Sequence, residues 1–499
     1  MTHSAESYGV KTYDKVTIES GTVTATGGTA EATGENSAYS YGVEAGDVTI
    51  SGGEATATGG AATGTNNAYS YGVESYGAVS ISSGTVEAAG GEARGDSAES
   101  YGISSYGLTI TGGTVTAVGE LAVDEGEGGD AYSYGVESYG DVVIENATVY
   151  ARGSQANYSA GIYTNGIIVE SGSVDALGGR AVNQDNPDAA ASAGIIAGIV
   201  TINGGEVTAS VGLTEHGTAD GICAYSDINI NGGTVTATGA SYTLGGVAPQ
   251  YSGGLFSEFG NVTITGENTV VNANGGCADN GITAVAAKRG NIVIEDGSIR
   301  ADGAYGGYTG YDGFGNGLSA LRDDGGAGGN IIISGGNLAV TGYTDSLYYE
   351  GELIVRPGSA RISVSVLDGW ILDEDTWDMD WDEMAASASQ IEGSPFGEET
   401  VIARALTEGK LYFGATDSAA NPGDPTDPDQ PIGPADPTGP SGSTDPIDSD
   451  EQNGNGDKGK DNPLTSDGSN MVLLLSLLLA SGTVVAAVTV YGRRPKREQ

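Results

Sequence analysis

The chain has 499 residues, enough for several ordinary domains, but its 86 Gly, 26 Tyr and only 5 Phe are an unusual composition. Its 66 acidic residues outnumber the 19 basic ones and give a formal net charge of -47, which argues against nucleic acid as a partner because phosphate binding needs clustered Lys and Arg. With His3 and His216 as the only histidines, most histidine-based zinc and acid–base sites are excluded as well.

The two cysteines, Cys223 and Cys277, lie far apart and have no C-x-x-C spacing, so the sequence indicates no metal or redox motif. A disulfide between them is an open alternative in an exported protein. Burial as two small apolar side chains is the favoured interpretation.

The N-terminus shows no export signal. Residues Met1–Ala5 contain neither a basic segment nor an apolar one, and repeat sequence begins by Glu6. We therefore expect the coding sequence to start further upstream, or the first coils to be missing.

A repeated unit organises residues 1–344. Each unit starts with a glycine followed by an aliphatic residue, and the spacing between units is 26 to 36 residues. The leading glycines are Gly9, Gly42, Gly72, Gly102, Gly135, Gly161, Gly194, Gly221, Gly254, Gly281 and Gly317. Two further short segments per unit alternate apolar and polar residues, as in Val48–Ile50 and Val115–Ala117, which is typical of strands with one buried face.

Glycine pairs such as Gly52-Gly53 separate the second and third segments and allow the positive φ of a tight corner. Three strands per unit with tight corners predict an all-β, right-handed parallel β-helix of about eleven coils, because one coil buries its apolar face only against its neighbours. At about 4.8 Å per coil, the rod is roughly 50 Å long. An antiparallel sandwich is the alternative, but the hairpin turns it needs do not recur.

The repeat resembles right-handed β-helix surface proteins of clostridia-like bacteria that are classed as carbohydrate-binding. The Gly-aliphatic start, Val48–Gly53 and Thr114–Ala117 carry this resemblance, which extends over roughly residues 6–344. It implies a solenoid that binds polysaccharide or host glycans.

Tyrosines form two ladders in the N-terminal half. Tyr71 and its equivalents precede the leading glycine, and strand parity predicts that they point inward and stack. The second ladder follows the glycine by four residues and is predicted to point outward. Both ladders stop after Tyr139. The outward members form an aromatic strip on which sugar rings could stack, with Tyr76, Tyr106 and Tyr139 as candidate carbohydrate-binding residues.

Acidic loops are candidates for calcium, although none has a known calcium-loop spacing. The weak candidate ligands are Asp373, Asp375 and Asp378, for which a solvated acidic surface is the favoured alternative. A calcium-dependent polysaccharide lyase is a further alternative. Its base would come from Lys288-Arg289, or from Arg322 beside Asp323 and Asp324. With no catalytic motif recognised, we predict a non-enzyme without an obligatory cofactor.

Two segments link the repeats to the C-terminus. Residues 345–414 depart from the repeat and contain all three tryptophans, so we predict a capping subdomain over the open end of the solenoid. Residues 415–461 carry a proline at every third position from Pro422 to Pro440. This pattern predicts a disordered, extended stalk with polyproline II character, on the order of 140 Å long.

The last segment, residues 462–499, determines the expected location. An uncharged apolar run at 471–491 is long enough for one transmembrane helix, and a basic tail that should stay cytoplasmic follows it. The residues before the run are Asn462, Pro463, Leu464, Thr465 and Ser466. This arrangement resembles the sorting signal of Gram-positive cell-wall proteins, Leu-Pro-any-Thr-Gly. Pro463 and Thr465 match that pattern, whereas Asn462 and Ser466 depart from it.

The resemblance implies that a sortase cuts after Thr465 and joins it to peptidoglycan, so that the head is extracellular on the cell wall and is membrane-anchored before processing. A plain membrane anchor is the alternative and gives the same topology. The sequence as a whole predicts a surface-anchored, non-catalytic adhesion protein that binds carbohydrate, with a passive structural surface protein as the alternative.

Overall fold

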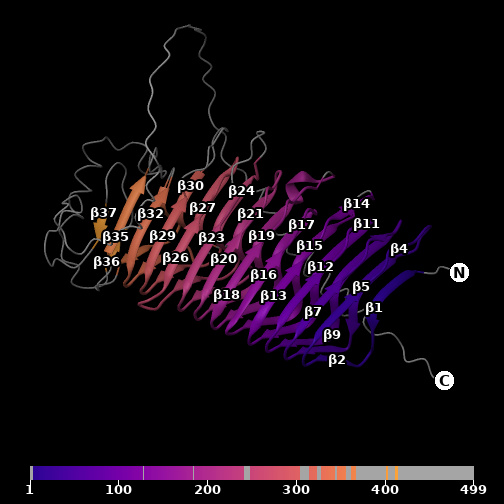
Figure 1. The fold of residues 1–499 in the computed structure, drawn as a ribbon. Helices are drawn as coiled ribbons and strands as arrows, with labels where there is room; N and C mark the ends of the chain where they lie inside the picture. Colours follow the sequence, from indigo (N-terminus) through magenta and orange to yellow (C-terminus); the bar gives the residue numbers. More distant parts are fainter. Residues whose placement is uncertain are drawn as a thin grey trace, which may run out of the picture.

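The computed structural model describes residues 4–126, 129–183, 185–240, 248–303, 314–322, 328–342, 345–355, 361–366, 400–402 and 411–413. Across them the chain is an all-β, right-handed parallel β-solenoid of about ten turns, close to the eleven predicted. Figure 1 shows the strands of successive turns side by side, in chain order from one end of a rod to the other. Within these ranges the only helix is a short 3-10 turn, η1 (Pro187–Ala189).

The first sheet contains twenty strands and supplies two walls of the solenoid. Its N-terminal members are β1 (Ala5–Lys11), β2 (Lys15–Ile18), β5 (Ala38–Ala45), β6 (Asp47–Ile50), β9 (Asn67–Ile81), β12 (Ser97–Ile110), β15 (Ala131–Ile144), β17 (Tyr158–Val169) and β19 (Ala191–Ile202). Its C-terminal members are β21 (Thr218–Ala224), β22 (Ile228–Ile230), β24 (Tyr251–Ser257), β25 (Val262–Ile264), β27 (Gly281–Ala287), β28 (Ile292–Ile294), β30 (Phe314–Ala320), β31 (Ile331–Ile333), β33 (Asp345–Tyr349), β34 (Leu353–Val355) and β36 (Thr400–Ile402).

The second sheet has thirteen strands and forms the third wall. Its members are β3 (Thr22–Thr26), β7 (Glu54–Thr58), β10 (Thr85–Ala89), β13 (Gly113–Val118), β16 (Ala147–Arg152), β18 (Gly172–Leu177), β20 (Glu206–Ser210), β23 (Thr234–Thr238), β26 (Val270–Asn274), β29 (Ser298–Gly303), β32 (Asn337–Gly342), β35 (Arg361–Val366) and β37 (Leu411–Phe413).

A third sheet was not predicted. It is formed by four short strands, β4 (Ala30–Glu31), β8 (Ala62–Thr63), β11 (Ala93–Gly95) and β14 (Ala122–Asp124). These strands lie between the third segment of one unit and the next leading glycine. Ala30, Ala62 and Ala93 of this sheet pack against Ala68 and Ala98 of the first sheet, so that the apolar side chains in this narrow part of the interior are alanines.

The main core confirms the predicted alternation. Val48 and Ile50 of β6 face the interior, and so do Val115 and Ala117 of β13. Parallel register places Ile81, Ile110 and Ile144 directly above one another on successive turns. The corner before the second sheet uses positive φ at Gly53 (81°), as the glycine pairs predicted. The interior is therefore a continuous column of stacked aliphatic side chains.

Register corrects one repeat boundary. Gly253 pairs with Thr283 and Leu255 with Val285, so Ala284, and not Gly281, occupies the leading-glycine position on that turn. The same ladder then reaches Gly317, as predicted.

The parallel ladders continue past residue 344, where the capping subdomain was predicted to begin. Strands β33, β34 and β35 stack on β30, β31 and β32 in parallel register. Strands β36 and β37 then pair antiparallel with β34 and β35. At this end β34 of the first sheet and β35 of the second are therefore each followed by a short antiparallel strand.

Candidate functional site

The most chemically distinctive surface lies where the strands of the first sheet bend at the leading glycine. On β5, Ala38 and Ser40 face the interior, and the Ser40 hydroxyl donates to the carbonyl of Gly28. Beyond the bend, Val43 and Ala45 join the main core. The residues between these inward positions, Tyr39, Tyr41 and Glu44, therefore face outward.

We call this surface the outer elbow. It comprises three positions on each turn: the residue before the leading glycine, and the residues two and four after it. In the N-terminal half its members are Tyr8, Tyr41, Tyr71, Tyr101, Tyr134, Lys11, Glu44, Glu74, Ser104, Glu137, Tyr13, Tyr76, Tyr106 and Tyr139.

The first tyrosine ladder stacks, as predicted, but it does not point inward. Tyr41 and Tyr71 lie 5.4 Å apart between ring centroids, and Tyr101 and Tyr134 lie 5.2 Å apart. They form a cluster separate from the aliphatic core, and Tyr71 is only 7% exposed. Parity counted from Val73 fails because the strand bends at Gly72. The stack also continues beyond the predicted end, since Tyr163 lies 5.0 Å from Tyr134.

A buried row of carboxylates lies beside the tyrosine stack and was missed in the sequence. Parallel register aligns Lys11, Glu44, Glu74, Ser104 and Glu137 at one position on successive turns. Glu44 and Glu137 are buried. The signal was present in the recurring Tyr-Gly-Val-Glu of three units, which places a glutamate beside each stacked ring.

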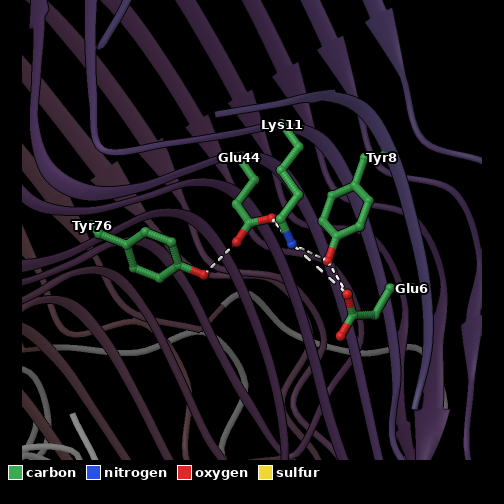
Figure 2. Close-up of polar contacts among 5 residues, drawn as sticks. All are labelled: Glu6, Tyr8, Lys11, Glu44 and Tyr76. Atoms are coloured by element: carbon green, nitrogen blue, oxygen red, sulfur yellow. Dashed lines mark hydrogen bonds and ion pairs between the residues drawn. The ribbon is translucent and has the colours of Figure 1, made fainter. Parts of the chain in front are cut away.

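Hydroxyl groups donate hydrogen bonds to some of the carboxylate oxygens in this row. Tyr76 Oη donates to Glu44 Oε1 at 2.6 Å (Figure 2), and Ser104 Oγ donates to Glu137 Oε2 at 2.9 Å. On the neighbouring position, Tyr71 Oη donates to Glu99 Oε2 at 2.7 Å. Neutral donors of this kind satisfy acceptor lone pairs without supplying countercharge.

Burial disfavours the charged form of these acids. It raises the pKa of Glu74 and of Glu137 to about 8, and that of Glu99 to about 7. Neighbouring carboxylates raise the pKa of Glu74 and Glu137 further, whereas hydrogen bonds from Tyr71 and Tyr101 lower that of Glu99. The elbow therefore holds protons at neutral pH that an unfolded chain would release.

We expect the melting temperature to rise as the pH falls from 9 to 5. A carboxyl whose pKa is raised in the folded state stabilises it fully below the unfolded value, and this stabilisation is lost as the pH rises through the folded value. Glu137→Gln should make the melting temperature depend less on pH between pH 5 and 9, because glutamine resembles the protonated acid and does not ionise.

The control for this profile is Glu87→Gln on β10, which removes the same charge at an exposed position on another face. If both variants keep the same pH profile, the buried row does not control the stability of the fold. Thermal unfolding followed by circular dichroism across the pH range makes the comparison.

The second tyrosine ladder is exposed, as predicted. Tyr76 is 50% exposed and Tyr106 53% exposed, and Tyr139 is partly exposed. The rings of Tyr106 and Tyr139 lie 5.4 Å apart with a tilt of 41°. The candidate residues thus lie on three successive turns, and Tyr76 contacts the buried row through Glu44.

The C-terminal half of the elbow carries Tyr225 and, on the next two turns, Glu258 and Lys288 at the position four residues after the leading glycine or its equivalent. Lys288 Nζ lies 2.7 Å from Glu258 Oε1 and 3.0 Å from Oε2, and both residues are buried. Nearby, burial raises the pKa of Asp220 to about 7 and that of the Cys223 thiol well above its usual value. The guanidinium of Arg289 lies 4.6 Å from the ring centroid of Phe259. Of the bases considered for a lyase, Lys288 is thus ion-paired and Arg289 is stacked on a ring, and the backbone N–H of Arg322 donates to Glu350 Oε2.

Cys223 and Cys277 are not joined by a disulfide, so the disulfide alternative is wrong for this structure. The sortase-like motif 462–466, the apolar run 471–491, the stalk and the candidate ligands Asp373, Asp375 and Asp378 lie outside the described residues. Within the ranges given above, no helix is long and apolar enough to cross a bilayer, and no group of three or more potential side-chain ligands could hold a metal ion.

Comparison with known proteins supports the architecture. Five segments match a family model described as "Beta helix repeat", at residues 16–38, 79–105, 108–132, 200–222 and 228–249. No match was found among curated proteins or among solved structures. The chain is therefore a parallel β-solenoid built in part from segments that match the beta-helix repeat.

Proposed function

We propose that this protein is a non-catalytic carbohydrate-binding adhesin whose ligand lies across Tyr76, Tyr106 and Tyr139. The observation that carries the proposal is the exposure of these three rings on successive turns of one face. Aromatic faces provide large apolar platforms with a polar hydroxyl at the edge, which suits the mixed apolar and hydroxylated faces of sugars. The beta-helix fold itself occurs in carbohydrate-binding and polysaccharide-modifying proteins, which supports this ligand class.

Replacing Tyr76, Tyr106 and Tyr139 together with alanine should weaken retention on an insoluble polysaccharide or a glycan array roughly 100-fold. Each lost stacking contact costs about 1 kcal/mol, and 1.4 kcal/mol corresponds to a tenfold change in affinity. Retention of the purified protein and of the variant is measured on the same array.

The matched control is Tyr150→Ala. Tyr150 is 41% exposed but belongs to β16 in the second sheet, away from the elbow. Equal losses for this control and for the triple variant would contradict a defined strip. Absence of retention on every glycan would leave a passive structural surface protein.

We further propose that the head is displayed on the cell wall, through sortase cleavage after Thr465 and transfer to peptidoglycan. The support is the order of motif, apolar run and basic tail in residues 462–499. Mass spectrometry of the wall-linked C-terminal peptide tests this step. A final residue other than Thr465 would contradict it.

A further inference from the structure

The first turn of the elbow holds an ammonium group. Lys11 Nζ lies 3.0 Å from Glu44 Oε2 and donates to Tyr8 Oη at 2.6 Å. It also lies 3.9 Å from the ring centroid of Tyr8 and 5.8 Å from that of Tyr13. Figure 2 shows the lysine between Tyr8 and Glu44, with Tyr76 reaching the same carboxylate from the other side. In this fold, tyrosine rings together with a buried carboxylate thus form a binding site for a primary ammonium group.

The following turns repeat the tyrosine rings and acidic residues of this site but have no lysine. Glu74, Ser104 and Glu137 continue the row that begins with Lys11 and Glu44. Glu74 Oε2 is buried and accepts no hydrogen bond. In the described part of the chain neither Glu74 nor Glu137 forms an ion pair. An acceptor atom buried in this way is costly unless a donor reaches it.

These observations converge on one ligand class. Tyr76 Oη donates to Glu44 Oε1, and Glu44 lies in the same register row as Glu74 and Glu137, so the exposed strip and the buried acids are one structure. Burial keeps both acids protonated at neutral pH in the absence of a cation, and a cation would supply the countercharge they lack. The net charge of -47 also favours the approach of cations over anions.

We propose that Glu74 and Glu137, beneath the rings of Tyr76, Tyr106 and Tyr139, bind the primary ammonium of an amino sugar that carries no N-acetyl group. The inference rests on the proposed carbohydrate-binding function and names its ligand class. The sugar ring stacks on the tyrosines, Glu74 releases its proton to the solvent, and the ammonium donates to the resulting carboxylate at Oε2. This carboxylate then takes the role that Glu44 has toward Lys11.

The test compares a glucosamine hexasaccharide with its N-acetylated counterpart by isothermal titration calorimetry on the whole protein. We expect the free amine to bind at least roughly tenfold more tightly, because a charge-assisted hydrogen bond to a buried carboxylate is gained. Glu74→Gln should abolish that difference by weakening only the amine ligand. Glu87→Gln, the same substitution on an exposed face, should leave both affinities unchanged.

Each outcome separates this inference from the proposed function. Equal binding of both hexasaccharides, unaffected by Glu74→Gln, overturns the ammonium site while carbohydrate binding stands. Equal weakening by Glu74→Gln and Glu87→Gln reveals attraction to overall charge and overturns the site as well. Binding of other glycans but neither hexasaccharide has the same effect, whereas failure of every glycan overturns the proposed function itself.

Discussion

Replacing Lys288 with methionine should lower the free energy of unfolding by about 3–5 kcal/mol, because it leaves Glu258 buried without its partner. Both carboxylate oxygens of Glu258 contact the ammonium, and neither residue has appreciable contact with solvent. Chemical denaturation at neutral pH measures the loss.

Two further variants test whether the burial of Glu258 and Lys288 accounts for this loss of stability. Replacing both partners, Glu258→Leu with Lys288→Met, should restore most of the stability, because apolar groups of similar volume need no countercharge. Arg94→Met removes an exposed cation that contacts Glu92 and Glu125, and should cost less than about 1 kcal/mol. A Lys288→Met loss no larger than that of Arg94→Met would show that the buried pair contributes little.

Local patterns were sufficient to predict the solenoid. Alternation in Val48–Ile50 identified the inward face, and the Gly52-Gly53 pair identified the corner, since both depend only on neighbours in the chain. The leading glycine at 281 was a wrong assignment because Gly281-Ile282 imitates the start of a unit three residues early. Only pairing with the strand before it, which places Val285 on Leu255, fixes the true register.

The sequence predicted the exposed tyrosines of the elbow but not its buried acidic residues, because burial there depends on contacts between turns. The exposure of Tyr76 follows from strand parity beyond the bend, but the direction of Tyr71 depends on the bend itself. Glu74 and Glu137 look like ordinary solvated acids in the sequence. Their burial comes from rings on neighbouring turns, and the pairing of Glu258 with Lys288 joins residues 30 positions apart. Contacts of this kind appear only after the register of the coils is known.

Gly102→Ala tests a close backbone approach at the leading-glycine position and should cost about 3 kcal/mol of stability. A Cβ atom at Gly102 would lie 2.4 Å from the Val118 nitrogen and 2.6 Å from the Gly135 carbonyl oxygen. Both are backbone atoms, one on β13 and one on the following turn, so no side chain can rotate away to make room. The bend at the leading glycine, and with it the whole elbow, depends on this close approach. The midpoint of chemical denaturation should fall accordingly.

Ala284→Gly is the matched control, because Ala284 lies at the equivalent position of another turn. Ala284 occupies the leading-glycine position on its own turn and is fully buried, so the coil around it is already built around a methyl group. Removing that methyl should cost about 1 kcal/mol, through lost burial and a more flexible unfolded chain. If Gly102→Ala is as mild as this control, the turns can shift along the axis of the rod to admit a side chain. The register that places Tyr76, Tyr106 and Glu74 together would then be adjustable rather than fixed by the glycines.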